Sequence, residues 1–206
     1  NGQANKSYGA ALIDDHTPTP EHARFLWSRL AKIVVIGGLL WLLPMMLLAT
    51  HYGWDHTLTQ MGWFFTKAAL LTFGGAYAVL PYIYQGAVGF YEWLTPAQMI
   101  DGLALGEATP GPLIMVVAFV GFIGGYVNAL FGPDMLFLAG AVAATLVVWF
   151  TFLPSFIFIL AGGPLVESTH GNLKFTAPLT AISAAVVGVI LNLAMFFGYY
   201  VLWPNG

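Results

Sequence analysis

A carboxylate and two prolines interrupt an apolar stretch, ALGEATPGPLIMVVAFVGF, that runs from Ala104 to Phe122. Pro110 and Pro112 each remove a backbone N–H donor, and Gly111 between them permits backbone conformations that other residues resist. Lipid offers no water to free backbone groups, so a helix broken at membrane depth persists only where protein or a wet cavity covers the break. This break therefore predicts a binding site, although a packing kink covered by a neighbouring helix would have the same sequence.

The chemistry that such a break offers is anion binding. A helix that restarts at Pro112 would aim free N–H groups and the positive end of its dipole back at the break. Thr109 could cap this helix or donate its hydroxyl to an oxyanion, and the cap is favoured because threonine before proline is an ordinary helix start. Glu107 and Asp101 are the candidate coupling groups, although Asp101, near a helix start, could instead complement the helix dipole.

Lys67 is a candidate cation for the same site. It lies near the middle of the apolar segment Met61 to Pro81, too deep to extend comfortably to the membrane surface. A charge at that depth needs an anion, because charged groups in membranes pair with one another or mark ion pathways. Either Glu107 or Asp101 forms a salt bridge with Lys67 inside the bundle, or the lysine attracts an anionic substrate. The sequence leaves both interpretations open.

Phe73, Gly74 and Gly75 form a second element that could interrupt a helix. Adjacent glycines weaken a helix and allow close backbone approach, although such a pair is also common where membrane helices pack together. Secondary transporters build binding sites near the centre of the bilayer from two helices interrupted at glycine or proline. The two elements together are therefore more specific than either one alone.

The composition excludes a water-soluble globular domain. Of the 206 residues, 59% are hydrophobic and only 7% are charged, whereas soluble proteins carry about 25% charged residues. The six basic residues are spread thinly and form no patch for nucleic acid. Cysteine is absent, which excludes thiolate metal sites, and the five histidines have no short metal-ligand spacing. We therefore predict no metal and no cofactor.

The predicted fold is all-α: a polytopic membrane helical bundle of about five to six spans with broken or re-entrant helices. Residues 1–24 are polar and predict a linker or tail, and residues 25–206 are expected to form one membrane domain, which the family resemblance below interprets as a transporter half-domain. Basic residues before the first span place its start in the cytoplasm. The stretch from Tyr82 to Leu94 is typical of a segment at the membrane interface. The expected spans are Ile33 to Thr50, Met61 to Pro81, the broken segment after Thr95, Met135 to Gly163, and Pro178 to Trp203.

Local signals predict where individual helices begin and end. Thr95 and Gln98 form a capping box, which predicts a helix from Pro96 to about Ala108. That helix and the one after the break are each too short to cross the bilayer comfortably, so they form either one kinked span or a re-entrant hairpin. Pro154 is expected to split the long apolar run that contains it.

Two segments of the chain match a known family. FFTKAALLTFGGAYAVLPY and WLTPAQMIDGLALGEATPGPLIMVVAFVGF, within Gly62 to Tyr126, strongly resemble the chromate ion transporter family, whose halves carry a similar FGG element and a later TPGP element. The resemblance implies the C-terminal half of a long-chain, two-half member, with the polar N-terminal segment as the linker between the halves. It further implies export of chromate, or movement of the isosteric sulfate, across a bacterial inner membrane.

The resemblance also implies partners and motif positions. The chain would work in a lipid bilayer with a homologous N-terminal half or a second half-length chain, and a homodimer is a further alternative. Its substrate would be the chromate or sulfate anion. The positions implied for substrate binding and coupling are Lys67, Phe73, Gly74, Gly75, Glu107, Thr109, Pro110, Gly111 and Pro112.

Two other classes of protein are weighed against transport. An intramembrane enzyme needs paired aspartates or a serine–histidine arrangement, but Ser155 and Ser183 have no histidine in a span. Asp101 likewise has no second intramembrane aspartate. A structural membrane subunit would explain the apolar composition, but it explains neither Lys67 nor the two interrupted segments. Transport is therefore the favoured function.

Overall fold

The computed structural model describes residues 26–72 and 76–168, and a few single positions between residues 187 and 198. Every regular element within residues 26–72 and 76–168 is helical, which agrees with the predicted all-α fold. The predicted linker and most of the predicted last span lie outside the described residues. The elements in chain order are α1 (Trp27–His51), α2 (Thr57–Leu71), α3 (Ala76–Tyr84), the π-helix η2 (Gln85–Phe90), α4 (Pro96–Ala108), the 3-10 turn η3 (Leu113–Met115), α5 (Val116–Val127), the 3-10 turn η4 (Pro133–Met135) and α6 (Leu136–Ser168).

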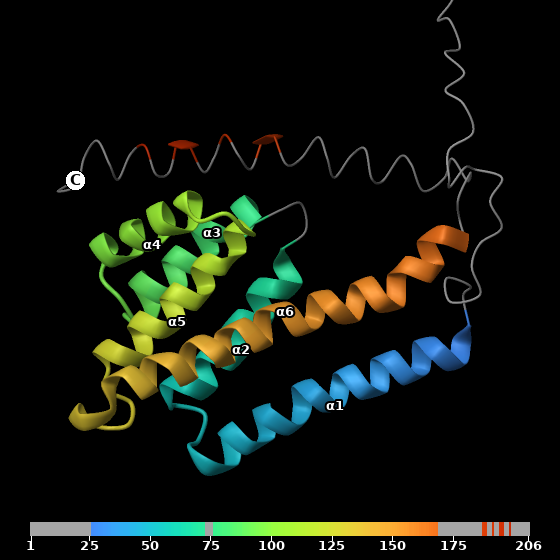
Figure 1. Cartoon of the computed structure of the whole chain (residues 1–206), viewed down its shortest axis with the longest axis horizontal. Coiled ribbons are helices and arrows are strands. Elements are labelled where there is room, and N and C mark those ends of the chain that lie inside the picture. Colours follow the sequence, from blue (N-terminus) through green and yellow to red (C-terminus); the bar gives the residue numbers. More distant parts are fainter. Residues whose placement is uncertain are drawn as a thin grey trace, which may run out of the picture.

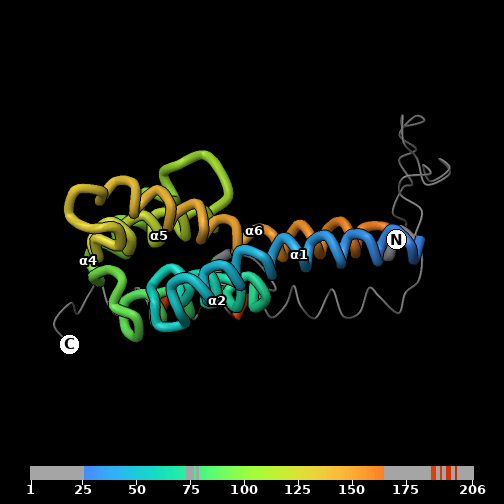
Figure 2. The backbone as a smooth tube through the Cα atoms, turned by 90° about the horizontal axis from the view of Figure 1, so that it is seen from below, coloured from blue at the N-terminus to red at the C-terminus, as the bar shows by residue number. Residues whose placement is uncertain are grey.

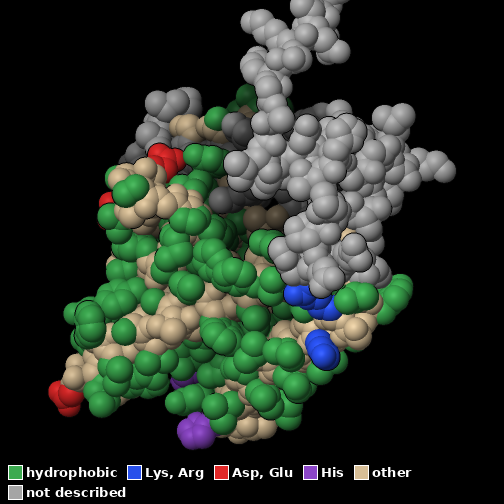
Figure 3. Space-filling model, turned by 45° about the vertical axis from the view of Figure 1, so that its right-hand side comes forward, with side chains coloured by type: hydrophobic (Ala, Val, Ile, Leu, Met, Phe, Trp, Pro, Cys, Tyr) green, Lys and Arg blue, Asp and Glu red, His purple; other side chains and the backbone are tan. Residues whose placement is uncertain are grey.

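The two longest helices, α1 and α6, lie side by side, and the shorter helices gather around one half of α6 (Figures 1 and 2). Two helical stretches, Trp27–His51 and Pro133–Pro164, are long and apolar enough to cross a membrane. Hydrophobic side chains cover most of the described face in view, and charged ones are few (Figure 3). Such a surface suits contact with lipid, which agrees with a helical membrane protein.

Proline inside α1 creates a link between the two long helices. Pro44 has no N–H to donate to the carbonyl of Leu40, four residues earlier. The indole N–H of Trp149, on α6, donates to that Leu40 oxygen over 3.2 Å. A second link joins α1 to α2, where the Trp41 indole donates to the Thr66 hydroxyl over 2.9 Å. Both bonds fix α1 by polar contacts in an otherwise apolar setting.

The prediction that Pro154 splits its apolar run was wrong. α6 continues through Pro154 without interruption from Leu136 to Ser168. The proline is buried, and it removes only one backbone bond from a long helix that many contacts to α5 and α2 hold in place. Tertiary packing therefore overrides the local preference of proline to end a helix.

Glycines bring α5 and α6 into close contact. A Cβ at Gly125 would lie 2.5 Å from the carbonyl oxygen of Ala139, and one at Gly121 would lie 2.9 Å from that of Ala143. Small residues four apart on both helices let the two backbones approach, as in membrane helix pairs. This pair forms the frame against which the short helices pack.

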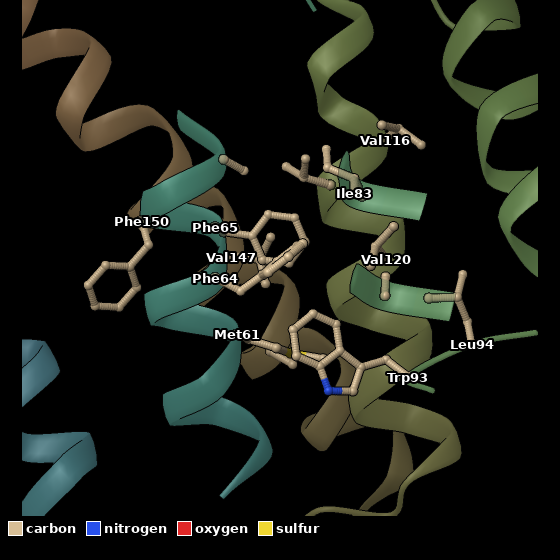
Figure 4. Packing of buried hydrophobic residues seen from close by; sticks show 14 of the residues in the cluster. Met61, Phe64, Phe65, Ile83, Trp93, Leu94, Val116, Val120, Val147 and Phe150 are labelled. Atoms are coloured by element: carbon tan, nitrogen blue, oxygen red, sulfur yellow. The ribbon is translucent and has the colours of Figure 1, made fainter. Parts of the chain in front are cut away.

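The core lies between α2, α5 and α6, and it includes residues that we expected at the membrane interface (Figure 4). Met61 and Phe65 of α2 and Val120 of α5 are fully buried. Trp93 and Leu94, only 2% and 4% exposed, pack into the same cluster. The end of the stretch Tyr82 to Leu94 thus folds inward and fills the space beside α2, and its position at the membrane interface stays a prediction.

The helix predicted by the capping box is confirmed at both ends. α4 begins at Pro96 and ends at Ala108. The Thr95 hydroxyl accepts from the Gln98 backbone N–H over 3.3 Å, and the Thr95 N–H donates to the Gln98 side chain over 2.8 Å. These reciprocal bonds satisfy two of the N–H groups that a helix start leaves free.

Candidate functional site

The break at residues 109–112 separates α4 from α5. Thr109 follows the last residue of α4, and its backbone N–H and its hydroxyl both donate to the Leu105 carbonyl, over 3.0 and 2.7 Å. Pro112 then precedes the turn η3, which has no side-chain cap. The favoured interpretation that Thr109 caps the second helix was therefore wrong, because its hydroxyl serves the end of the first helix instead.

The two helices that flank this break fold back on each other. A Cβ at Gly102 on α4 would overlap the ring of Phe119 on α5, and one at Gly106 would lie 3.6 Å from the Val116 side chain. Such contacts form only between neighbouring antiparallel helices, which Figure 1 also shows for α4 and α5. The geometry is therefore a helical hairpin and not one kinked helix.

The FGG element also separates two short helices. Phe73, Gly74 and Gly75 themselves lie outside the described residues, but α2 ends just before them and α3 begins just after them. Phe64 of α2 stacks on Tyr82 of α3 with 4.8 Å between ring centroids and 8° between ring planes. This contact requires the chain to reverse between the two helices, so they form a second hairpin.

The two hairpins meet. α3, which follows the FGG element, contacts the turn η3, which follows the TPGP element. The helix after the FGG element therefore lies beside the turn after the TPGP element, and the pairing of the two breaks themselves stays a prediction. The candidate residues of the second break lie at the surface of the chain: Glu107, Thr109, Pro110, Gly111 and Pro112 are all exposed, as is Asp101.

Lys67 lies in a different place from the break at residues 109–112. It lines an open cavity of about 400 Å³ between α2, the end of α3 and the π-helix, together with Tyr82, Gln85 and Tyr91. None of residues 107–112 lines this cavity. Within residues 26–72 and 76–168, Lys67 forms no salt bridge with any acidic side chain. The structure thus does not contain the salt bridge to Glu107 or Asp101 that was one interpretation of this lysine.

Sequence reasoning missed the other polar residues of this cavity. Tyr82 and Tyr91 were assigned to a membrane interface, and Gln85 was given no role. Their convergence depends on the hairpin that stacks Tyr82 on Phe64 and on the π-helix that begins at Gln85. The available signal was the concentration of tyrosine and amide side chains shortly after the FGG element. No group of three potential metal-ligating residues occurs in the part of the chain that the structure describes.

Short helices interrupted at glycine and proline, packed against helices long enough to cross a bilayer, are the pattern that membrane transporters use to build binding sites. The chain matches the family model described as Chromate transporter over residues 59–204. It therefore belongs to the chromate transporter family.

Individual relatives agree with this assignment. A chromate transport protein of Pseudomonas aeruginosa is 43% identical over 60% of this chain and 26% of its own length. One of Cupriavidus metallidurans is 32% identical over 65% of this chain and 30% of its own length. An uncharacterized transporter of Methanocaldococcus jannaschii is 30% identical over 72% of this chain and 34% of its own length. The chain thus spans about a quarter to a third of these relatives, and no solved structure matches it.

Proposed function

We propose that this chain is part of a multi-pass transporter that moves a tetrahedral oxyanion, chromate or the isosteric sulfate, across the bacterial inner membrane. The observation that carries the proposal is the α4–α5 hairpin, which turns at the TPGP element in a member of the chromate transporter family. Two relatives that are 43% and 32% identical are chromate transport proteins by name. An intramembrane enzyme or a structural subunit would not need such a turn.

The start of η3, directly after the turn at residues 109–112, would offer backbone donors to the anion. η3 starts at Leu113 without a side-chain cap, and the first N–H groups of a helix have no partner within the helix. Pro110 and Pro112 keep the chain from continuing α4, and Gly111 adds no side chain that would shield the turn. The Thr109 hydroxyl can join the site only by leaving the Leu105 carbonyl, so the backbone is the main donor.

The remaining motif residues would complete the site. Phe73, Gly74 and Gly75 would form the opposite turn, since the helix that follows them contacts η3. Lys67, apart from this turn in the cavity beside α2, would supply the positive charge that a dianion requires along its path. Glu107, at the exposed end of α4 beside the turn, is the proposed proton-coupling group, with Asp101 as the second candidate.

The transporter would need further chain beyond the residues that carry the two hairpins. The aligned region covers only 26% to 30% of the chromate transport proteins of Pseudomonas and Cupriavidus. We therefore propose a homologous N-terminal half or a second half-length chain as the partner, with a homodimer as the alternative arrangement.

Transport by reconstituted full-length protein tests the proposal. Vesicles that contain the full chain should take up labelled chromate, and sulfate should compete. The double variant Pro110→Ala with Pro112→Ala should lose most of this uptake and keep normal expression, since it straightens the turn. Pro133→Ala, in the turn η4 at the start of α6, is the matched control and should transport like the parent. Absence of chromate and sulfate uptake by the parent protein would contradict the function.

A further inference from the structure

The cavity beside Lys67 gathers donor groups from three consecutive elements. We propose that this cavity is a binding station for a tetrahedral dianion, with the Lys67 ammonium, the Tyr82 and Tyr91 hydroxyls and the Gln85 amide as its donors. This inference rests on the proposed function and gives the substrate a second position, apart from the turn at residues 109–112.

The size and accessibility of the cavity suit a small ligand. Its volume of about 400 Å³ lies within the range of small-molecule sites. Lys67, Tyr82 and Tyr91 are half-buried and Gln85 is exposed, so the cavity is open on one side of the chain. A substrate ion can therefore enter without a rearrangement of the core beneath it.

The donor groups have no other use within residues 26–72 and 76–168. Neither the Lys67 ammonium, the two tyrosine hydroxyls nor the Gln85 amide forms a hydrogen bond or salt bridge with another residue there. Lys67 and the two tyrosines are half-buried, and partly buried polar groups without partners cost more free energy than groups in bulk water, the ammonium most of all. Four such groups around one space therefore indicate a ligand that accepts hydrogen bonds.

The chemistry of the lining selects an anion. Among the described residues, no aspartate or glutamate lines the cavity, and Lys67 contributes a positive charge. Ammonium, hydroxyl and amide groups all donate hydrogen bonds, and charge-assisted bonds to an anionic oxygen are the strong ones. Chromate and sulfate present four oxygens in a tetrahedron, so several donors can be satisfied at once. A metal cation would meet the ammonium and be repelled.

Aromatic packing holds the two tyrosines in place. Tyr82 stacks on Phe64, and Tyr91 stacks on Trp93 with 4.6 Å between centroids and 9° between planes. Phe64 also meets the ring of Tyr91 edge-on, with 5.7 Å between centroids. The stacked ring thus fixes the position of each tyrosine side chain. A Tyr→Phe substitution can therefore remove the hydroxyl without loss of this packing.

The π-helix is an independent pointer to the same place. η2 runs from Gln85 to Phe90, and both of its end residues line the cavity. A π-helix places an extra residue in the turn at a cost in backbone stability, and such turns are frequent at functional sites. Here the wider turn brings Gln85 and the following Tyr91 onto the same cavity.

Equilibrium binding of radiolabelled sulfate to purified full-length protein tests the station, with chromate as competitor. Tyr82→Phe and Tyr91→Phe remove one hydroxyl each and keep the stacked rings, and Gln85→Leu removes the amide. Each should weaken sulfate binding by about tenfold or more, and Lys67→Met should weaken it further, while Lys67→Arg restores part of it. The matched controls are Tyr126→Phe and Lys32→Met, which should bind sulfate like the parent. Tyr126 lies on α5, and its ring stacks on Phe122. Size-exclusion profiles and melting temperatures check that each variant is folded.

Parallel uptake measurements separate the station from the transport function. The station would be supported if the cavity variants lost both sulfate binding and uptake while the control variants kept both. Normal binding and uptake in folded Tyr82→Phe, Gln85→Leu and Lys67→Met would overturn it and leave the transport function standing. Sulfate binding that depends on the cavity residues, in a parent protein without uptake, would retain the station and overturn the function. A parent that neither binds nor transports either anion would overturn both.

Discussion

The rings of Phe64 and Tyr82 lie parallel, 4.8 Å apart between centroids, although the FGG element separates them in the chain. This stacked pair holds α2 and α3 together away from the turn that joins them. Side chains must do this, because two helices form no backbone hydrogen bonds with each other. The stacked pair also places the Tyr82 hydroxyl beside Lys67 on the cavity. Packing and site geometry therefore depend on the same ring pair.

Glycine at position 86 should be essential to that ring pair. A Cβ at Gly86 would overlap the ring of Phe64, whereas one at Gly89 in the same π-helix would meet nothing within 4 Å. We expect Gly86→Ala to destabilise the protein by about 1–3 kcal/mol, as overpacking does, and Gly89→Ala to have little effect. Melting temperatures of the two variants in the same detergent provide the measurement. Equal melting temperatures would show that Phe64 moves aside freely.

The bond from Trp149 to the Leu40 carbonyl should contribute to stability. Trp149→Phe removes the only N–H of the side chain and leaves that carbonyl, already deprived by Pro44, without its donor. A loss of about 1 kcal/mol is expected. Trp63→Phe is the control, because both indoles are 42% exposed and Trp63 has no hydrogen bond within residues 26–72 and 76–168. Chemical unfolding measures the free energy of unfolding of both variants. Equal losses of stability in the two would assign the effect to the smaller ring and not to the hydrogen bond.

The sequence predicts features of this fold whose causes are local. The capping box of Thr95 and Gln98 involves residues three apart, so it defines the start of α4 without any knowledge of the rest of the chain. The break after α4 follows in the same way from two prolines. Thr109 shows the limit of such reasoning, because its hydroxyl could serve either neighbouring helix and only the geometry places it on Leu105.

Features that depend on distant contacts escaped prediction. Pro154 remains helical because α5 and α2 hold α6 in place, and no signal near the proline reveals those partners. Likewise, Trp93 is buried because the hairpin before it returns to α2, while its amphipathic ring suggested an interface. The Lys67 cavity needs both the chain reversal and the π-helix, so sequence spacing alone could not identify Tyr82 or Gln85 as its neighbours.

Ala129 should be a position where glycine is better than alanine. It follows the C-terminal end of α5 with a φ of 46°, in the left-handed region where a Cβ is disfavoured. Ala129→Gly is expected to raise stability by about 0.5–1 kcal/mol. Ala104→Gly, at an exposed position within α4, should lower it by a similar amount because glycine weakens helix interiors. The midpoint of unfolding should rise in Ala129→Gly and fall in Ala104→Gly. A lower midpoint in both variants would contradict backbone strain at position 129.

Glu107 should control how transport depends on pH. If its carboxylate carries the coupled proton, Glu107→Gln removes the group that binds and releases it, and uptake becomes less sensitive to pH. Asp101→Asn tests the second candidate, and Asp134→Asn, at an exposed turn before α6, is the control that should keep the parent profile. Chromate uptake by vesicles over a series of pH values is the measurement. A Glu107→Gln profile that matches the parent would remove Glu107 from proton coupling.

His56 should make the loop between α1 and α2 sensitive to acid. Its Nδ1 accepts from the Leu58 backbone N–H over 3.2 Å at the start of α2, and protonation would abolish that acceptor. Burial lowers the pKa of His56 from its usual 6.5, so the folded state binds the proton less readily than the unfolded state. The associated stability is therefore complete above pH 6.5 and is lost as the pH falls below that value.

The variant His56→Asn separates the cap from the titration. An asparagine side chain can accept the same N–H but does not titrate, so the variant should keep α2 capped and lose part of the acid sensitivity. Melting temperatures between about pH 8 and 5 provide the comparison. His51→Asn, at a ring that lies 4.6 Å from that of Tyr52 in the same region, is the matched control. An unchanged pH dependence in His56→Asn would show that the cap remains intact when His56 is protonated.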